Sequence, residues 1–201
     1  MLPLVFSCAA LPPEQISVEP EKAPPVKTPV EKPEPSKYIM GNGLVIGDKL
    51  SMFLVQNNLQ VNPEFVQALA LLYIEEAAIE GVNHDIAFAQ MCLETGFLGF
   101  GGLVHPDWNN FCGLGAIGPE QPGLVFPDPR TGVRAHIQHL KAYASVEPLN
   151  MDLVNPRFRF IRRGNSPTID GLAGTWATDK LYADKISNIL YRLYDFSFAG
   201  Y

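Results

Sequence analysis

The sequence lacks two features that mark common classes of protein. It has no apolar run approaching the roughly 20 residues of a membrane-spanning helix, so we do not expect a segment that crosses a bilayer as a helix. It also lacks an excess of basic residues: 15 Lys and Arg face 21 Asp and Glu, and the formal net charge of -6 argues against a surface for nucleic acid. Of the 201 residues, 47% are hydrophobic, which is enough for one ordinary domain with a buried core plus a tail.

The first ten residues, MLPLVFSCAA, form a short apolar stretch that ends in small residues around Cys8. They resemble the end of a bacterial lipoprotein signal, in which the cysteine is lipidated after cleavage. No basic residue precedes the short apolar part, so either the true start lies further upstream or the resemblance is accidental and the segment is an unstructured apolar start. The resemblance implies a protein that is exported to the cell envelope, attached to the membrane only through this lipid and facing the periplasm or the cell wall.

Residues 11–37 hold eight of the chain's eighteen prolines, together with five glutamates and four lysines. With so few large apolar side chains, this segment cannot offset the entropy cost of ordering, and proline biases it toward extended polyproline II. We therefore expect a disordered linker that reaches on the order of 80 Å at ~3.1 Å per residue. A single domain over residues 38–201 is expected to follow.

Two helices are indicated early in this domain. Asn62 and Pro63 have the types expected at an N-cap and at the first helical position, and Gly81 ends the pattern. The apolar stripe predicted for this helix is Phe65, Ala68, Leu69, Leu72 and Ile79. Asn83 is expected to cap a second helix, which Gly96 ends in a left-handed conformation.

The second helix is apolar on nearly every face, so we expect it to be buried at the centre of the domain. Gln90 and Glu94 interrupt the apolar surface and, being four residues apart, share one face. Burial of an unpartnered carboxylate raises its pKa, and a protonated acid beside a cleft is what general-acid catalysis needs. The alternative is an ion pair that only locks the core, between Glu94 and one of Arg130, Arg134, Arg157 or Arg159.

The following segment, residues 97–118, carries six glycines among several aromatic residues. Its backbone can approach a ligand closely, and the rings of Phe97, Trp108 and Phe111 can stack on it. Together with the amides of Asn109 and Asn110, such rings are suited to bind sugars and N-acetyl groups. The alternative is that the rings belong to the core of a glycine-rich loop.

Four separated blocks occur in an order typical of one family: FAQMCLETGF, NNFCGLGAIG, GVRAHIQHLKAYA and WATDKLYADKI. From about Val45 to Tyr194 the chain resembles the bacterial glucosaminidase family, glycoside hydrolase family 73, whose members are mannosyl-glycoprotein endo-β-N-acetylglucosaminidase-like. The resemblance implies a mainly α, lysozyme-like α+β fold around a central buried helix that carries the catalytic glutamate. It also implies a peptidoglycan hydrolase that cleaves the β-1,4 bond after N-acetylglucosamine in glycan strands.

The resemblance places Glu94 on the family's catalytic acid, which protonates the departing glycosidic oxygen. Tyr182 matches a tyrosine that orients the N-acetyl group or the incoming water, and Trp176 stands where many members have tyrosine, so any hydroxyl-dependent role there is in doubt. Asn109, Asn110 and Phe111 match the segment that shapes the cleft wall. The predicted substrate-binding residues are Gln90, Phe97, Trp108, Asn109, Asn110, Phe111 and Trp176.

The chain departs from the family between Gly115 and Arg130. Many relatives carry an extended β-lobe with a second acidic residue here, whereas AIGPEQPGLVFPDPR is long enough only for a reduced β-hairpin. Glu120 is the best-placed second catalytic carboxylate, with Asp128 behind it. A substrate 2-acetamido group can replace such a carboxylate, and Glu120 can equally be a solvated loop residue.

Several other residues suggest sites that we weigh against simpler interpretations. His136 and His139 lie on a predicted helix, where we expect a solvated face instead of metal ligands, and we predict no metal and no cofactor. Cys92 and Cys112 fit a disulfide or two buried thiols equally well. The segment RFRFIRRG at 157–164 fits a site for the acidic stem peptides of peptidoglycan or a solvated turn.

The last predicted helix covers residues 182–194, and nothing in the chain resembles a coiled coil, so we expect a monomer. Two functions compete with the hydrolase. A lytic transglycosylase also needs one glutamate but forms a 1,6-anhydro product. A non-catalytic peptidoglycan-binding module would keep the rings and amides without the chemistry.

Overall fold

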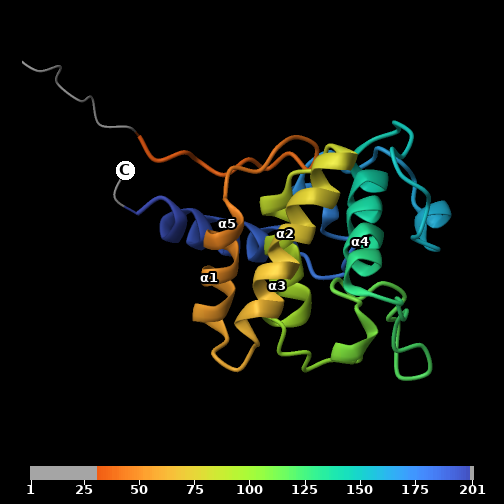
Figure 1. The fold of residues 1–201 in the computed structure, drawn as a ribbon. Coiled ribbons are helices and arrows are strands. Elements are labelled where there is room, and N and C mark those ends of the chain that lie inside the picture. The colour runs from red at the N-terminus through yellow and green to blue at the C-terminus, as the bar shows by residue number, and fades with distance from the viewer. Residues whose placement is uncertain (1–30, 200–201) are drawn as a thin grey trace, which may run out of the picture. The chain divides into compact units, whose positions relative to one another are not determined.

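The computed structural model describes residues 31–199, and helices provide nearly all of their regular structure (Figure 1). The α-helices are α1 (Gly47–Asn57), α2 (Pro63–Glu80), α3 (His84–Thr95), α4 (Pro129–Ala144) and α5 (Tyr182–Ser197). Short 3-10 turns lie at η1 (Pro106–Trp108), η2 (Phe158–Phe160) and η3 (Ile169–Leu172). Strand-like pairing within 31–199 is limited to isolated bridges, one of which joins Gly118 and Gln121. The mainly helical prediction is therefore confirmed, and only a small turn occupies the position of the β-lobe.

Some predictions concern residues outside the described range. The lipoprotein-signal segment 1–10 with Cys8, and residues 11–30 of the expected linker, lie outside it. The compact unit begins at Glu31. None of the helices between residues 31 and 199 combines the length and apolar character needed to cross a membrane.

Helices α2 and α3 begin and end at the predicted residues because their caps supply the missing backbone partners. The side chain of Asn62 accepts hydrogen bonds from the first turn of α2, and Asn83 does the same for α3. Gly81 and Gly96 adopt left-handed conformations, with φ of 72° and 57°, which end the two helices. The side-chain amides and the glycines together fix where α3, and therefore Glu94, is placed.

Helix α3 is the central element of the unit, packing against α2, α4 and α5, while α2 lies between α1 and α4 (Figure 1). Its apolar side chains from Ile86 to Cys92 are fully buried, as predicted from the sequence. They join one continuous core with residues of all the other α-helices. Between its two ends α3 is buried on every side, and Glu94 is partly exposed at the C-terminal end.

The buried face of α2 differs from the predicted stripe. Of the five predicted residues only Leu69 is buried, while Phe65, Ala68 and Ile79 are exposed. The helix instead buries Glu76 and Glu80 against cations of α4: Arg134 Nε donates to Glu76 at 2.7 Å, and Lys141 Nζ donates to Glu80 at 2.8 Å. The sequence of α2 is apolar on several sides, so tertiary ion pairs decide which side faces inward.

Residues 38–45 form a strap that ties the start of the unit to α3. The backbone N–H of Asn83 donates to Ile39 O at 2.8 Å, and those of Leu44 and Val45 donate to the carboxylate of Asp85 at 2.7 and 3.2 Å. Tyr194 from α5 donates its hydroxyl to the same carboxylate at 2.8 Å. Asp85 thus joins three segments at the N-terminal end of α3.

Candidate active site

Glu94 lies in the last turn of α3 with its side chain partly exposed. Two donors reach the same carboxylate oxygen, Oε1: the hydroxyl of Tyr182 from α5, and the indole Nε1–H of Trp176 at 3.0 Å. The other oxygen, Oε2, has no donor among residues 31–199 and lies 3.6 Å from where a Cβ on Gly113 would be. Because Oε1 already accepts two hydrogen bonds, the proton of the neutral acid belongs on Oε2.

Burial of the carboxyl raises the pKa of Glu94, while the hydrogen bonds from Tyr182 and Trp176 act in the opposite direction. The C-terminal end of the α3 dipole also disfavours the ionised form. Glu94 therefore holds its proton more strongly than an ordinary glutamate. Once the proton has left, the hydrogen bonds from Tyr182 and Trp176 stabilise the carboxylate. Both properties suit a general acid.

No cation is paired with Glu94 among the described residues. Arg130 and Arg134 bind Glu76 instead, and the guanidinium groups of Arg157 and Arg159 stack on Phe160. The alternative in which one of these four arginines locks Glu94 into the core is therefore not what the structure shows.

A chain of hydrogen bonds runs through the core and ends at Glu94. Tyr73 Oη lies 2.9 Å from His136 Nδ1, and His136 Nε2 lies 2.9 Å from Gln90 Oε1. Gln90 Nε2 donates to the Tyr182 hydroxyl at 2.8 Å, and that hydroxyl donates to Glu94. Gln90 is fully buried, so it reaches Glu94 through Tyr182 instead of lining an open cleft.

The expectation that His136 and His139 form a solvated face is wrong. His136 is fully buried in the hydrogen-bond chain, and His139 is buried against Trp176, with ring centroids 4.8 Å apart. Desolvation lowers the pKa of both imidazoles to about 3, so both are neutral at ordinary pH. His136 lies three and four residues from Val133 and Leu140, and this helical spacing was the sequence signal for its burial. Tyr73, which no sequence pattern singled out, completes the chain.

The glycine-rich loop is held in shape by its asparagines. Asn110 is buried, its amide group donates to the carbonyls of Leu114 and Leu124 at 2.9 Å each, and its oxygen accepts from Leu114 N–H. Asn109, at φ 52°, donates to Phe126 O at 3.0 Å. The structure thus gives Asn110 its hydrogen-bond partners within the loop, supporting the wall from inside.

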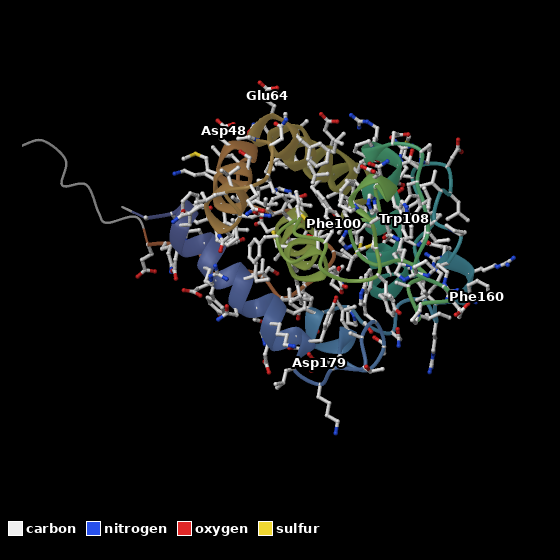
Figure 2. All side chains as sticks on the ribbon, turned by 90° about the horizontal axis from the view of Figure 1, so that it is seen from below. Asp48, Glu64, Phe100, Trp108, Phe160 and Asp179 are labelled. Atoms are coloured by element: carbon white, nitrogen blue, oxygen red, sulfur yellow. The ribbon has the colours of Figure 1, made fainter. Side chains whose placement is uncertain are left out.

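The aromatic residues of the loop have different surroundings. Phe111 is buried in the core, and the Phe97 ring packs against Phe53 with centroids 6.0 Å apart. Trp108 is partly exposed. Figure 2 views α3 nearly end-on, with Phe100 beside it, Trp108 further away toward α4, and Phe160 at the outer edge of the unit. Phe111 is therefore a packing residue in this structure, whereas Phe97, Trp108 and Trp176 are all partly exposed.

A groove of about 220 Å³, here called the Trp176 groove, adjoins Glu94 through Gly113 and Trp176. It is formed by the loop, the C-terminal part of α4 and the segment that contains η2. Its lining residues are Cys112, Gly113, Leu114, Gly115, Ala116, Ile117, His139, Tyr143, Arg157, Phe160, Ile161, Thr175 and Trp176. None of them is a carboxylate.

The two residues considered for a second carboxylate lie elsewhere. Glu120 is exposed on the turn between Gly118 and Gln121. Asp128 is the N-cap of α4 and accepts from the backbone N–H of Thr131 at 2.9 Å, which lowers the pKa of Asp128. Asp128 therefore has a structural task that the sequence analysis did not assign to it.

Both cysteines of the domain are buried free thiols, so of the two interpretations the disulfide is wrong. Burial raises the pKa of Cys92 and of Cys112, which keeps them protonated. No group of three or more His, Cys, Asp or Glu side chains among residues 31–199 is arranged to hold a metal ion.

Comparison with known proteins gives a family and a relative. The glucosaminidase family model, described as mannosyl-glycoprotein endo-beta-N-acetylglucosaminidase, matches residues 55–195. An uncharacterized protein of Borreliella burgdorferi is 39% identical over 175 residues, which cover 87% of this chain and 86% of that protein. No solved structure matches the chain.

The mainly helical fold, with an acid at the end of a central helix and beside a groove, defines a lysozyme-like glycoside hydrolase domain. The chain belongs to the glucosaminidase family, glycoside hydrolase family 73, as the sequence blocks predicted. Membership supports peptidoglycan hydrolase activity in general.

Proposed function

We propose that this protein is an endo-β-N-acetylglucosaminidase that cleaves the β-1,4 bond after N-acetylglucosamine in peptidoglycan, with Glu94 as general acid. The observation that carries the proposal is the state of Glu94: a carboxyl with a raised pKa, unpaired with any cation among residues 31–199, whose Oε2 lies next to the groove wall at Gly113. An acid held in this way can donate a proton to a sugar in the groove.

In the proposed reaction, the proton on Glu94 Oε2 passes to the glycosidic oxygen as the bond from C1 to that oxygen breaks. The electron pair of the bond leaves with the protonated oxygen, and Oε1 retains the hydrogen bonds from Tyr182 and Trp176. These two donors stabilise the carboxylate that proton transfer creates. A water molecule then adds its oxygen to C1 and gives a proton to the Glu94 carboxylate, which restores the acid and completes hydrolysis.

The second catalytic group is proposed to be the substrate's own 2-acetamido group, which forms the new bond to C1 before water opens it. The support is the exposed position of Glu120 and the N-cap role of Asp128, the two residues considered for a second carboxylate. On this proposal, Glu120→Gln hydrolyses cell-wall substrate at nearly the wild-type rate. A fall of 100-fold or more, about the size expected for loss of a catalytic acid or base, would instead assign the second role to Glu120.

A zymogram on cell-wall substrate tests the central proposal by comparing wild type, Glu94→Gln and the surface variant Glu147→Gln. We expect clearing by wild type and Glu147→Gln, and a rate for Glu94→Gln that is lower by at least roughly 10²–10⁴-fold. Absence of clearing by the folded wild type would favour a non-catalytic binding module. Equal clearing by Glu94→Gln would remove Glu94 from the mechanism.

The positions of Glu120 and Asp128 also make a lytic transglycosylase a second candidate, because that reaction needs one acid only. Mass spectrometry of the released muropeptides distinguishes the two. Hydrolysis gives ordinary reducing ends, whereas transglycosylation gives 1,6-anhydro ends that are lighter by one water.

We also propose that the protein is exported and attached to the membrane through a lipid on Cys8, since peptidoglycan lies outside the cytoplasm. The support is the sequence around this cysteine. Metabolic labelling with a fatty acid should mark the wild type and leave Cys8→Ser unlabelled, and label on both would refute the anchor.

A further inference from the structure

The Trp176 groove carries a positive charge that a neutral amino sugar does not need. Arg157 is the one lining residue with a formal charge, since His139 is neutral and no carboxylate is present. The whole chain has a net charge of -6, yet four arginines fall within residues 157–163. A local reversal of charge inside a groove selects for an anionic ligand.

Two of these arginines have free donors: Arg157, which lines the groove, and Arg159, which lies outside it but stacks on Phe160, a lining residue. The guanidinium carbons of Arg157 and Arg159 lie 5.0 and 4.8 Å from the centre of the Phe160 ring, which is 62% exposed. Stacking of this kind orients a guanidinium while leaving its N–H edge available. Among residues 31–199 neither group forms an ion pair.

Asn155 connects the segment that carries these arginines to His139, a lining residue of the groove. The backbone N–H of Arg157 donates to Asn155 Oδ1 at 2.9 Å, and the amide of the fully buried Asn155 lies 2.8 Å from His139 Nδ1. Arg163, by contrast, donates to the backbone carbonyls of Ser145 and Glu147. The first two arginines are therefore available for a ligand, and Arg163 fastens the turn.

We propose that Arg157 and Arg159 form a subsite for the carboxylates of the peptide carried by the glycan strand. The inference rests on the proposed function and names the substrate class more closely: a peptide-substituted glycan instead of a bare one. Trp176 binds Glu94 and lines the same groove as Arg157, so the peptide-bearing sugar lies next to the bond that is cleaved.

Binding to a catalytically silent protein tests this subsite without relying on turnover. Soluble, fluorescently labelled glycan strands with their peptides, and the same strands stripped of peptide by an amidase, are titrated against Glu94→Gln. Adding Arg157→Gln or Arg159→Gln should weaken binding of the peptide-bearing strands by about tenfold, and leave binding of stripped strands unchanged. Arg162→Gln, an exposed arginine on the same turn, is the matched control and should change neither.

Three results would overturn the subsite: equal affinity for both kinds of strand, an equal effect of Arg162→Gln, which would indicate only a diffuse positive field, or no binding to either strand. Failure of the hydrolase proposal gives a different pattern. There, the wild type would not clear cell-wall substrate, while peptide-dependent binding through Arg157 would persist.

The hydrogen-bond chain from Tyr73 to Glu94 carries a second, independent inference. If the Tyr73 hydroxyl donates to His136 Nδ1, then Nε2 bears the imidazole hydrogen and donates to Gln90 Oε1. The amide N–H of Gln90 then donates to Tyr182, whose hydroxyl proton must point to Glu94. With the other imidazole tautomer, Gln90 would turn over and its oxygen would attract the Tyr182 proton away from Glu94.

We infer that Tyr73, His136 and Gln90 are positioning residues that direct the Tyr182 hydroxyl to the carboxylate of Glu94.

The titratable groups packed around Glu94 are Tyr182 from α5 and Cys112 from the loop, with His136 and Tyr73 beyond. Arg157 and His139 both line the Trp176 groove. Burial raises the pKa of Tyr73, Tyr182 and Cys112, and lowers the pKa of His136 to about 3. The alkaline limb of the pH–rate profile therefore reports Glu94.

The test removes one hydroxyl that is three hydrogen bonds away from Tyr182. In Tyr73→Phe the alkaline limb of kcat/KM should move to higher pH, because a less well directed donor stabilises the Glu94 anion less. Tyr182→Phe should move it further in the same direction. Tyr194→Phe is the matched control: it also loses a buried hydroxyl, which bonds Asp85 at the opposite end of α3, and should leave the limb in place.

An unmoved limb in Tyr73→Phe, or an equal movement in Tyr194→Phe, would refute the positioning role. If the protein has no measurable hydrolase activity, NMR titration of the Glu94 carboxyl carbon compares the pKa of Glu94 in wild type, Tyr73→Phe and Tyr194→Phe. The inference can then fail or stand separately from the proposed hydrolase activity.

Discussion

The substitution Gly132→Ala has two opposite effects on stability, one from helix propensity and one from a steric clash. Gly132 lies in the first turns of α4, where alanine is favoured over glycine by about 1 kcal/mol from helix propensity alone. An alanine Cβ at this position would, however, lie 1.8 Å from the backbone oxygen of Asn109, whereas real Cβ atoms essentially never come closer than 3.0 Å. Helix α4 and the loop must therefore separate by more than 1 Å, and overpacking of this kind costs about 3 kcal/mol.

The clash should outweigh the propensity, so we expect the free energy of unfolding of Gly132→Ala to fall by about 2 kcal/mol. The displaced Asn109 adjoins Asn110, which shapes the loop beside Glu94, and a displacement of about 1 Å at an active site can cost about 100-fold in rate. Urea unfolding and the rate on glycan strands measure the two effects.

Gly102→Ala is the control, because a Cβ there meets nothing within 4 Å, and its stability should stay within about 0.5 kcal/mol of wild type. A Gly132→Ala protein that is more stable than wild type and fully active would refute the reasoning, since propensity alone would then have decided the outcome.

Other substitutions test the buried charges and the loop. Glu94→Gln should be more stable than wild type near neutral pH, and the difference in Tm should vanish below the ordinary pKa of about 4.5, since the raised pKa destabilises the folded state only where the carboxyl ionises. Lys141→Met leaves Glu80 buried without its cation and should cost about 3–5 kcal/mol in urea unfolding, part of which Glu80→Gln restores. Asn110→Ala removes three hydrogen bonds within the loop and should cost about 3 kcal/mol, with activity falling more than secondary structure measured by circular dichroism.

The sequence predicted those elements whose signals are local. The caps at Asn62 and Asn83 and the glycines at 81 and 96 fixed α2 and α3 because a cap acts within one turn of the chain. Helix α1 was not predicted, because Ile46 stands at its N-cap position and supplies no side-chain hydrogen bond that would mark its start. Glu94 was found because one carboxylate in an apolar helix is unusual at the level of sequence alone.

Features that depend on partners from other helices could not be predicted in this way. Glu76 and Glu80 face inward only because α4 supplies Arg134 and Lys141. His136 carries a helical spacing that indicates burial, but its role needs Tyr73 and Gln90 from α2 and α3. Long-range polar contacts of this kind are set by tertiary packing, which periodicity within one helix does not contain.

The strap of residues 38–45 gives the unit a mechanical property. Its bonds join Ile39 to Asn83, and Leu44 and Val45 to the Asp85 carboxylate, so a pull on the chain from its N-terminal side reaches the base of α3 through them. Tension arriving from that side is taken up at the base of α3, at the far end of the helix from Glu94.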